Sequence, residues 1–357
     1  MKLGRAIILL VVVVVIVIVV LYAYESTTAP SVNKAWAAGP NYPLNLNGVV
    51  GVGGQQCVNG TTYVYCIGGQ DINSGPRDEV YSSAMAAGSS GNLSAWTSDT
   101  NVYPVNINGQ SCVSYSGFAY CVGGSYDPGG DDVASSYFAP MSGPQIGTWI
   151  STTAFPIPVD SQSCVASSGY IYCVAGDNET DATEADATLT NSVYYAQIST
   201  SGIGNWTLTT AYPPNVYLPS CFTERGYIYC IGGADQNDNA VGTAYYATLS
   251  PSGVGAWTET ASYPQAESGL ACVISSGDIY CLGGMGAENS YTSAAYYAPI
   301  SPSGIGAWKR AGDFPRAEQT TCFSLSNDVY CVGGFDSSNG ENGAVYYTPL
   351  SSFTKQG

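Results

Sequence analysis

Histidine is absent from this chain of 357 residues, and basic residues are scarce. Without histidine there is no His-ligated zinc or copper site, and no Ser-His-Asp or Cys-His catalytic arrangement. Nine Lys and Arg residues face 26 acids, which gives a net charge of -17. Binding to a phosphate backbone needs clustered basic side chains, so nucleic acid is excluded as a partner.

Charged residues of both signs are also few, at 10% of the chain, whereas 45% of the residues are hydrophobic. The hydrophobic fraction is large enough for a sizeable core. A surface built mainly from Ser, Thr, Asn and Gly changes little with pH, because only its few carboxylates titrate in mild acid. We therefore expect the protein to tolerate an acidic exterior.

The N-terminus contains one long uncharged apolar run, residues 6–24. At ~1.5 Å per residue a helix of this length spans roughly 28 Å, close to the hydrocarbon thickness of a bilayer. Lys2 and Arg5 precede the run and favour a cytoplasmic N-terminus. We predict a transmembrane anchor over residues 1–24, with the lipid bilayer as its partner, and a linker over residues 25–34.

A cleaved signal peptide is the alternative for residues 1–24. Its apolar core is normally shorter, about 7–15 residues, and Leu21-Tyr22-Ala23 is a poor cleavage site. Both interpretations place the rest of the chain outside the cytoplasm, where disulfides persist. The predicted location is the cell membrane, with a single span and the C-terminal domain outside.

All twelve cysteines occur in pairs whose members are nine positions apart. In SCVSYSGFAYCVGG, Ser116-Gly117 suits a two-residue type I′ turn, which needs positive φ. Alternation along the hairpin then makes Cys112 and Cys121 a non-hydrogen-bonded pair, with Cα atoms about 4.5 Å apart. We predict six hairpin disulfides: Cys57–Cys66, Cys112–Cys121, Cys164–Cys173, Cys221–Cys230, Cys272–Cys281 and Cys322–Cys331.

Metal binding is the alternative for these cysteines. A zinc site needs four ligands, usually with closer C-x2-4-C spacing, and no histidine is available to complete one.

Each cysteine pair begins a repeat of 50 to 57 residues. Gly-Gly or Ala-Gly follows the second cysteine, then come a polar loop, an aromatic strand such as SVYYAQIS, a turn, a tryptophan and an aromatic-Pro pair. Each unit thus offers four short strands separated by turn residues. Strands this rich in Val, Ile and Tyr are buried on both faces, as in stacked propeller sheets.

The repeat resembles that of the kelch-repeat β-propeller family over Trp36 to Phe353. The resemblance is carried by the Gly-Gly after the second strand, the Tyr of the third strand and the Trp that begins the fourth. It implies an all-β, six-bladed propeller over residues 35–353, with a tail at 354–357. The last copy lacks its Trp strand, so we expect the strand at Trp36 to complete the sixth blade and close the ring.

The loops after each glycine pair hold sixteen of the 26 acids, and they emerge on the face that kelch-like proteins commonly use for partners. These acids are Asp71, Asp78, Glu79, Asp127, Asp131, Asp132, Asp177, Glu179, Asp181, Glu184, Asp186, Asp235, Asp238, Glu288, Asp336 and Glu341. Alternating oxygen donors suggest Ca²⁺ binding at Asp177, Glu179 and Asp181, and at Asp235, Asn237 and Asn239. Solvated turn residues are the alternative, and apart from calcium no cofactor is expected.

Most of the 29 tyrosines fall at repeat positions and are expected in the core. Off-register loop residues are better ligand contacts, and we select Tyr126, Asp127, Asp131, Asp132, Tyr291 and Asp336. Four Asn-x-Ser/Thr sequons, at Asn59, Asn92, Asn178 and Asn205, are candidate glycosylation sites.

These features predict a binding, adhesion or envelope-interaction module that recognises an extracellular protein or glycan through its acidic loop face. We assign no catalytic residue. The alternative is a propeller glycosidase that uses two carboxylates of the acidic loops. Copper oxidases with a similar fold need histidine ligands, and sialidases need an arginine cluster. Beyond the N-terminus this chain has only Arg77, Arg225, Arg310 and Arg316.

Overall fold

The computed structural model describes residues 36–43, 52–71, 75–85, 93–126, 131–178, 188–325, 327–337 and 340–353. The chain divides into two units, Met1–Lys34 and Ala35–Gly357, and every described residue belongs to the second. Within the described ranges no helix is long and apolar enough to cross a membrane. The predicted anchor, residues 1–24, and the linker lie outside these ranges, so they stay predictions.

The described residues are almost entirely β-strand, arranged as six larger antiparallel sheets in chain order. Sheet 1 contains β2 (Gln56–Asn59), β3 (Tyr63–Ile67), β6 (Val80–Ala84) and β7 (Thr97–Ser98). Sheet 2 contains β9 (Ser111–Tyr115), β10 (Phe118–Val122), β13 (Ser136–Pro140) and β14 (Ile150–Ser151). Sheet 3 contains β15 (Ser163–Ser167), β16 (Tyr170–Val174), β17 (Val193–Ser199), β18 (Gly202–Ile203) and β19 (Thr207–Leu208).

The second half of the chain repeats this order. Sheet 4 contains β20 (Ser220–Glu224), β21 (Tyr227–Ile231), β22 (Ala244–Ser250), β23 (Gly253–Val254) and β24 (Thr258–Thr260). Sheet 5 contains β25 (Ala271–Ser275), β26 (Asp278–Leu282), β27 (Ala295–Ser301), β28 (Gly304–Ile305) and β29 (Lys309–Arg310). Sheet 6 contains β30 (Glu318–Leu325), β31 (Asp328–Asp336), β32 (Gly340–Pro349) and the N-terminal β1 (Ala37–Ala38), and α2 (Leu350–Phe353) follows it.

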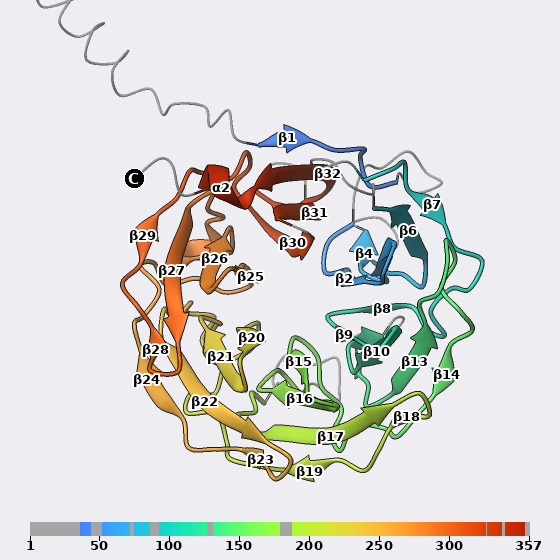
Figure 1. Cartoon of the computed structure of the whole chain (residues 1–357), viewed down its shortest axis with the longest axis horizontal. Coiled ribbons are helices and arrows are strands. Elements are labelled where there is room, and N and C mark those ends of the chain that lie inside the picture. The colour runs from blue at the N-terminus through green and yellow to red at the C-terminus, as the bar shows by residue number, and fades with distance from the viewer. Residues whose placement is uncertain are drawn as a thin grey trace, which may run out of the picture. The chain divides into compact units, whose positions relative to one another are not determined.

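The six sheets stand in a closed ring around a central axis (Figure 1). The first strand of each sheet is the innermost one, and it contacts the first strand of both neighbouring sheets, including β2 against β30 across the two ends of the repeat array. Two smaller sheets are also present. One pairs β4 (Gln70–Asp71) with β5 (Gly75–Pro76), and the other contains β8 (Ile107–Asn108), β11 (Ser125–Tyr126) and β12 (Asp131–Asp132). This arrangement is consistent with a β-propeller.

The predicted hairpins and their disulfides are confirmed. Ser116 and Gly117 both have positive φ, 48° and 81°, as a type I′ turn requires. This turn sets Cys112 opposite Cys121 in the pairing of β9 with β10. All six predicted disulfides are present, with Cα–Cα distances of 4.0 to 4.1 Å, and no cysteine is free.

Hydrophobic clusters between neighbouring sheets form the core, and the glycine pairs let those sheets approach each other. The N–H of Gly124 donates to the carbonyl of Val159, at the start of the next sheet, over 2.8 Å. A Cβ on Gly123 would collide with the same carbonyl. Both glycines have positive φ, which is why other residue types are disfavoured there.

Each repeated tryptophan packs on an aromatic residue of the preceding repeat and not on the aromatic-Pro pair that follows it in sequence. The sequence pattern grouped Trp149 with Phe155-Pro156, yet Trp149 packs edge-to-face on Tyr103 at 4.9 Å, and Phe155 packs on Trp206. Each aromatic-Pro residue therefore meets the tryptophan of the following unit. Edge-to-face geometry adds about 1 kcal/mol per pair to the burial of the rings.

The N-terminal strand completes sheet 6. In the pairing of β1 with β32, Ala37 lies opposite Tyr347 and Ala38 opposite Tyr346. Trp36 packs edge-to-face on Phe314 at 4.9 Å. Residues from the two ends of the repeat array thus share one sheet, which leaves the ring without an open edge between its first and last units.

Candidate functional site

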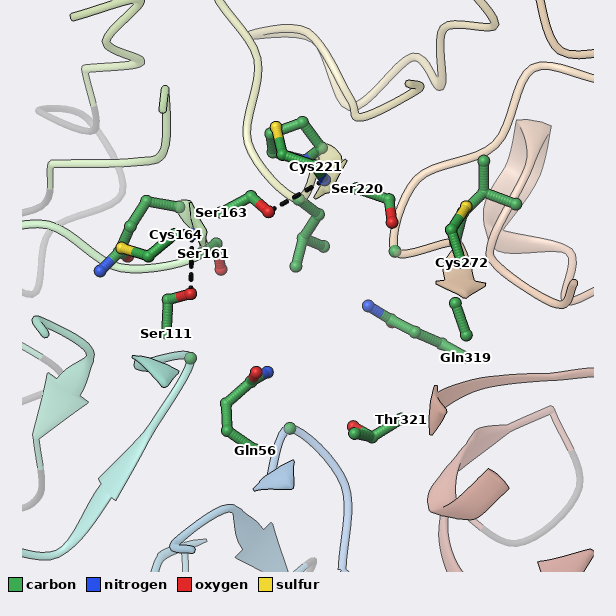
Figure 2. A pocket seen from close by; sticks show the side chains of 18 of the residues that line it. Gln56, Ser111, Ser161, Ser163, Cys164, Ser220, Cys221, Cys272, Gln319 and Thr321 are labelled. Carbon is green, nitrogen blue, oxygen red and sulfur yellow. Dashed lines mark hydrogen bonds between the residues drawn. The ribbon is translucent and has the colours of Figure 1, made fainter. Parts of the chain in front are cut away.

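A cavity of about 240 Å³ lies at the centre of the ring, where the innermost strands begin (Figure 2). All six sheets line it. The lining residues are Gly54, Gln56, 109–112, 161–164, 218–221, 269–272, 319–322 and Gly334. In most sheets these residues are the end of the connection from the preceding sheet and the first residues of the innermost strand.

The cavity lining is polar but carries no charge. Among the residues that the structure describes, its side chains are those of Gln, Ser, Thr, Cys, Leu, Ala and Pro, with glycines between them. The chain as a whole has a net charge of -17, so the absence of charge distinguishes this cavity lining from the rest of the protein. It offers amide and hydroxyl groups, which both donate and accept hydrogen bonds.

Serine and threonine hydroxyls at the lining join neighbouring sheets. Ser111 Oγ accepts the backbone N–H of Cys164 at 2.9 Å, and Ser163 Oγ accepts that of Cys221 at 3.0 Å (Figure 2). Thr321 Oγ1 donates to the carbonyl of Gln55 at 2.8 Å, which connects the last sheet to the first. These three hydroxyls hold the wall together.

Backbone hydrogen bonds continue around the opening from sheet to sheet. Ser161 N–H donates to Gly109 O at 2.9 Å, Leu218 N–H to Ser161 O at 2.8 Å, and Gly269 N–H to Leu218 O at 3.1 Å. Ser161 and Leu218 have φ of 51° and 52°, a left-handed conformation that costs free energy for residues other than glycine. Backbone hydrogen bonds therefore join sheets 2 to 5 at the opening.

Three buried glutamines also connect neighbouring sheets, and two of them, Gln110 and Gln162, belong to the cavity lining. The Nε2 groups of Gln55, Gln110 and Gln162 donate to carbonyls of the preceding sheet in the ring, those of Val332, Ile67 and Val122, at 2.7 to 2.9 Å. The predictions from the sequence did not include these glutamines. Their repeated position could have identified them, because GQQC, GQSC and SQSC each place a glutamine two positions before the first cysteine of a pair.

The loops that sequence analysis selected lie on the face where the cavity lining begins. Isolated bridges pair three of these loops with the connection that enters the innermost strand of the same sheet: Asp177 with Asp160, Ala234 with Tyr217, and Met285 with Ser268. Ser161, Leu218 and Gly269, the next residues along these connections, line the cavity.

The individual ligand-face residues are distributed around this face and do not line the cavity. Tyr126 is 38% exposed and pairs with the exposed Asp131. Asp132 is buried, and the buried Asp336 forms an ion pair with Arg316. Tyr291 is half-buried. Asp127 lies outside the described residues.

Among the predicted calcium ligands that the structure describes, Asp235 forms hydrogen bonds with backbone groups of its own loop. Asp235 Oδ1 accepts the backbone N–H groups of Asn237 at 2.8 Å and Asn239 at 3.0 Å, and these bonds hold the pKa of Asp235 below its ordinary value. Burial raises the pKa of Asp177. Glu179 and Asp181 lie outside the described residues. In the described part of the chain no three Asp, Glu, Cys or His residues form a metal-binding group, and calcium binding stays a prediction.

The sequons differ in how their asparagines are used. Asn59 Nδ2 donates to Ser324 O at 3.1 Å, and Asn178 Nδ2 to Pro158 O at 2.6 Å, so both amide nitrogens are engaged within the fold. Asn205 is exposed. Asn92 lies outside the described residues. Glycosylation of all four asparagines stays a prediction, and Asn205 presents the most accessible side chain of the three described.

Glu267 occupies a position that is aliphatic in four other sheets. Its carbonyl accepts the N–H of Gly233, as the carbonyls of Val52, Ile107, Val159 and Val216 accept the matching glycine N–H groups elsewhere. The Glu267 side chain is 4% exposed, and its Oε2 has no hydrogen-bond partner among the described residues. Burial raises the pKa of Glu267 from 4.5 to about 7.

We expect this carboxyl to make the protein more stable in mild acid. Because the folded pKa exceeds the unfolded one, stability is highest below pH 4.5 and falls as pH rises to about 7. Glu267→Gln should raise the melting temperature by a few degrees at pH 8, corresponding to about 2 kcal/mol, and leave it unchanged at pH 4. Calorimetry at both pH values measures this, with the exposed Glu259→Gln as control. Equal effects of Glu267→Gln at both pH values would contradict it.

Comparisons with known proteins identify a fold and no family. No protein-family model matches the chain, and no curated protein matches it. Among solved structures the chain is similar to the structure of YjhT, with a TM-score of 0.69 and 13% sequence identity. The match covers 86% of this chain and 95% of that one. At this identity the similarity establishes the fold alone.

Proposed function

We propose that this chain is a six-bladed kelch-like β-propeller that serves as a binding or adhesion module on the outside of the cell. The closed ring of six sheets and the repeated glycines, tyrosines and tryptophans support the kelch assignment. Six disulfides support a location in an oxidising compartment. In this proposal the N-terminal segment holds the ring at the membrane, with the acidic loops as a surface for an extracellular protein or glycan.

One observation carries the binding function: the central cavity and the selected loops share one face of a rigid ring. Loops on a rigid scaffold are where binding residues concentrate. A glycosidase would need two carboxylates around the reacting bond. Among the described residues that line the cavity none is a carboxylate. Glu267 and Glu318, whose carboxyls have pKa values raised to about 7 by burial, are buried outside it. Binding without turnover is therefore the function we favour.

A glycan array probed with oxidised protein spanning residues 30–357 tests this proposal. We expect saturable binding to a restricted set of glycans, and no release of sugar from those glycans on prolonged incubation. Chromatography of the supernatant measures release. Sustained product formation that a single replacement such as Asp131→Asn abolishes would overturn the binding proposal in favour of a glycosidase.

A further inference from the structure

Side chains that extend into the central cavity without a hydrogen-bond partner determine which ligand the cavity can bind. Gln56 from β2 and Gln319 from β30 extend toward the middle of the cavity, and Ser220 from β20 lies across from Gln56 (Figure 2). None of these three side chains has a hydrogen-bond partner among the described residues, whereas Ser111 and Ser163 are used to join sheets. The cavity therefore presents two free amides and a free hydroxyl from three different sheets.

A second set of unpartnered atoms lies in the same wall. Gln110 and Gln162 are only 1% and 6% exposed, and each uses its Nε2 to join two sheets. Their Oε1 atoms are buried without a partner within the described chain, and both residues line the cavity. Because these two oxygen atoms have almost no exposed surface, they offer no contact to a ligand, and the free amides of the cavity are those of Gln56 and Gln319.

We propose that the central cavity binds one neutral sugar residue, held by the amides of Gln56 and Gln319. This inference rests on the proposed binding function and assigns its ligand class. The volume of about 240 Å³ is below the roughly 300–1,000 Å³ of pockets for drug-sized ligands, which suits a single ring. The hydroxyls of a sugar donate and accept hydrogen bonds, as do the amides that face them.

The uncharged wall sets the selectivity. An acidic sugar would bring a carboxylate into a cavity with no basic side chain among its described lining residues, and burying an unpaired charge is costly. The cavity should therefore select neutral sugars over uronic acids of the same size. Backbone hydrogen bonds join sheets 2 to 5 at the opening before a ligand enters, and this preorganisation lowers the entropic cost of binding.

Titration calorimetry of oxidised protein spanning residues 30–357 with D-galactose, D-mannose and N-acetyl-D-glucosamine tests the proposal, with D-galacturonate as the charged comparison. At least one neutral sugar should bind with 1:1 stoichiometry, and galacturonate at least tenfold more weakly. Gln56→Met and Gln319→Met keep the side-chain length and remove the amide, so each should weaken binding about five- to tenfold. The control is Gln197→Met, since Gln197 is exposed on β17.

The melting temperatures of the variants show whether each one is folded. Wild-type affinity in both folded cavity variants, or equal binding of galacturonate, would overturn the proposal. If the monosaccharides do not bind while the intact protein still binds glycans on the array, the cavity assignment is wrong and the proposed function holds. If neither binds, both are wrong.

Discussion

Reduction of the six disulfides should unfold the ring of sheets at room temperature. Each disulfide closes a loop of about ten residues, which the chain-entropy model values at about 3 kcal/mol. Six such contributions sum to about 18 kcal/mol, which exceeds the roughly 5–15 kcal/mol by which folded proteins are stable. Circular dichroism of reduced and alkylated protein should show no cooperative thermal transition.

The matched control is protein treated with the alkylating reagent alone, which should melt like untreated protein because no cysteine is free. Removing one disulfide, with Cys221→Ala and Cys230→Ala together, should cost about 3 kcal/mol and leave the ring folded. A reduced protein that melts within a few degrees of the oxidised one would contradict the prediction. Free thiols in protein isolated from the cell's membrane fraction would contradict its location outside the cytoplasm.

Loss of the N-terminal strand should cost more stability than any single substitution outside the core. Protein that begins at residue 44 lacks β1 and Trp36, and it also lacks Tyr42, which is 2% exposed and packs on Tyr81 and Trp96. Trp96 Nε1 also loses its acceptor, Pro40 O at 3.0 Å. Loss of one buried aromatic residue costs about 3–5 kcal/mol.

We therefore expect the truncated protein to lose more than about 5 kcal/mol relative to protein that begins at residue 30. Urea denaturation measures this, and a synthetic peptide spanning residues 30–43 should restore part of the loss by pairing with β32. Tyr42→Ala in the longer protein should reproduce about half of the effect. Asn41→Ala is the control, since Asn41 is exposed. Unchanged stability after truncation would mean that β1 does not hold the ring closed.

Local features of the fold were readable from the sequence because they depend on residues close together in the chain. Ser116-Gly117 sets the turn type, and the turn sets the pairing of Cys112 with Cys121 only a few residues away. The number of repeats and the missing Trp strand of the last copy likewise indicated how the ring closes, through Trp36. The membrane anchor and the kelch relationship also came from the sequence, and they stay predictions.

The candidate site was not readable in this way, because each of its contacts joins residues forty or more positions apart. Periodicity does not show that Trp149 packs on Tyr103 of the preceding unit, or that Gln110 donates to Ile67. Gln56 and Gln319 occupy unremarkable positions one and three residues before a cysteine, and only the closed ring places them around one cavity. The acidic residues of the loops directed the predictions toward those loops, whereas the central cavity has an uncharged wall.

The sequence by itself thus determined the repeat, the hairpins and the disulfide pairing, since turn chemistry and spacing act within one unit. The tertiary structure decided which neutral side chains face the axis, which backbone groups join sheets at the opening, and which carboxyls are buried. These properties arise only when six units close on one another, because burial and cavity shape belong to the assembled ring.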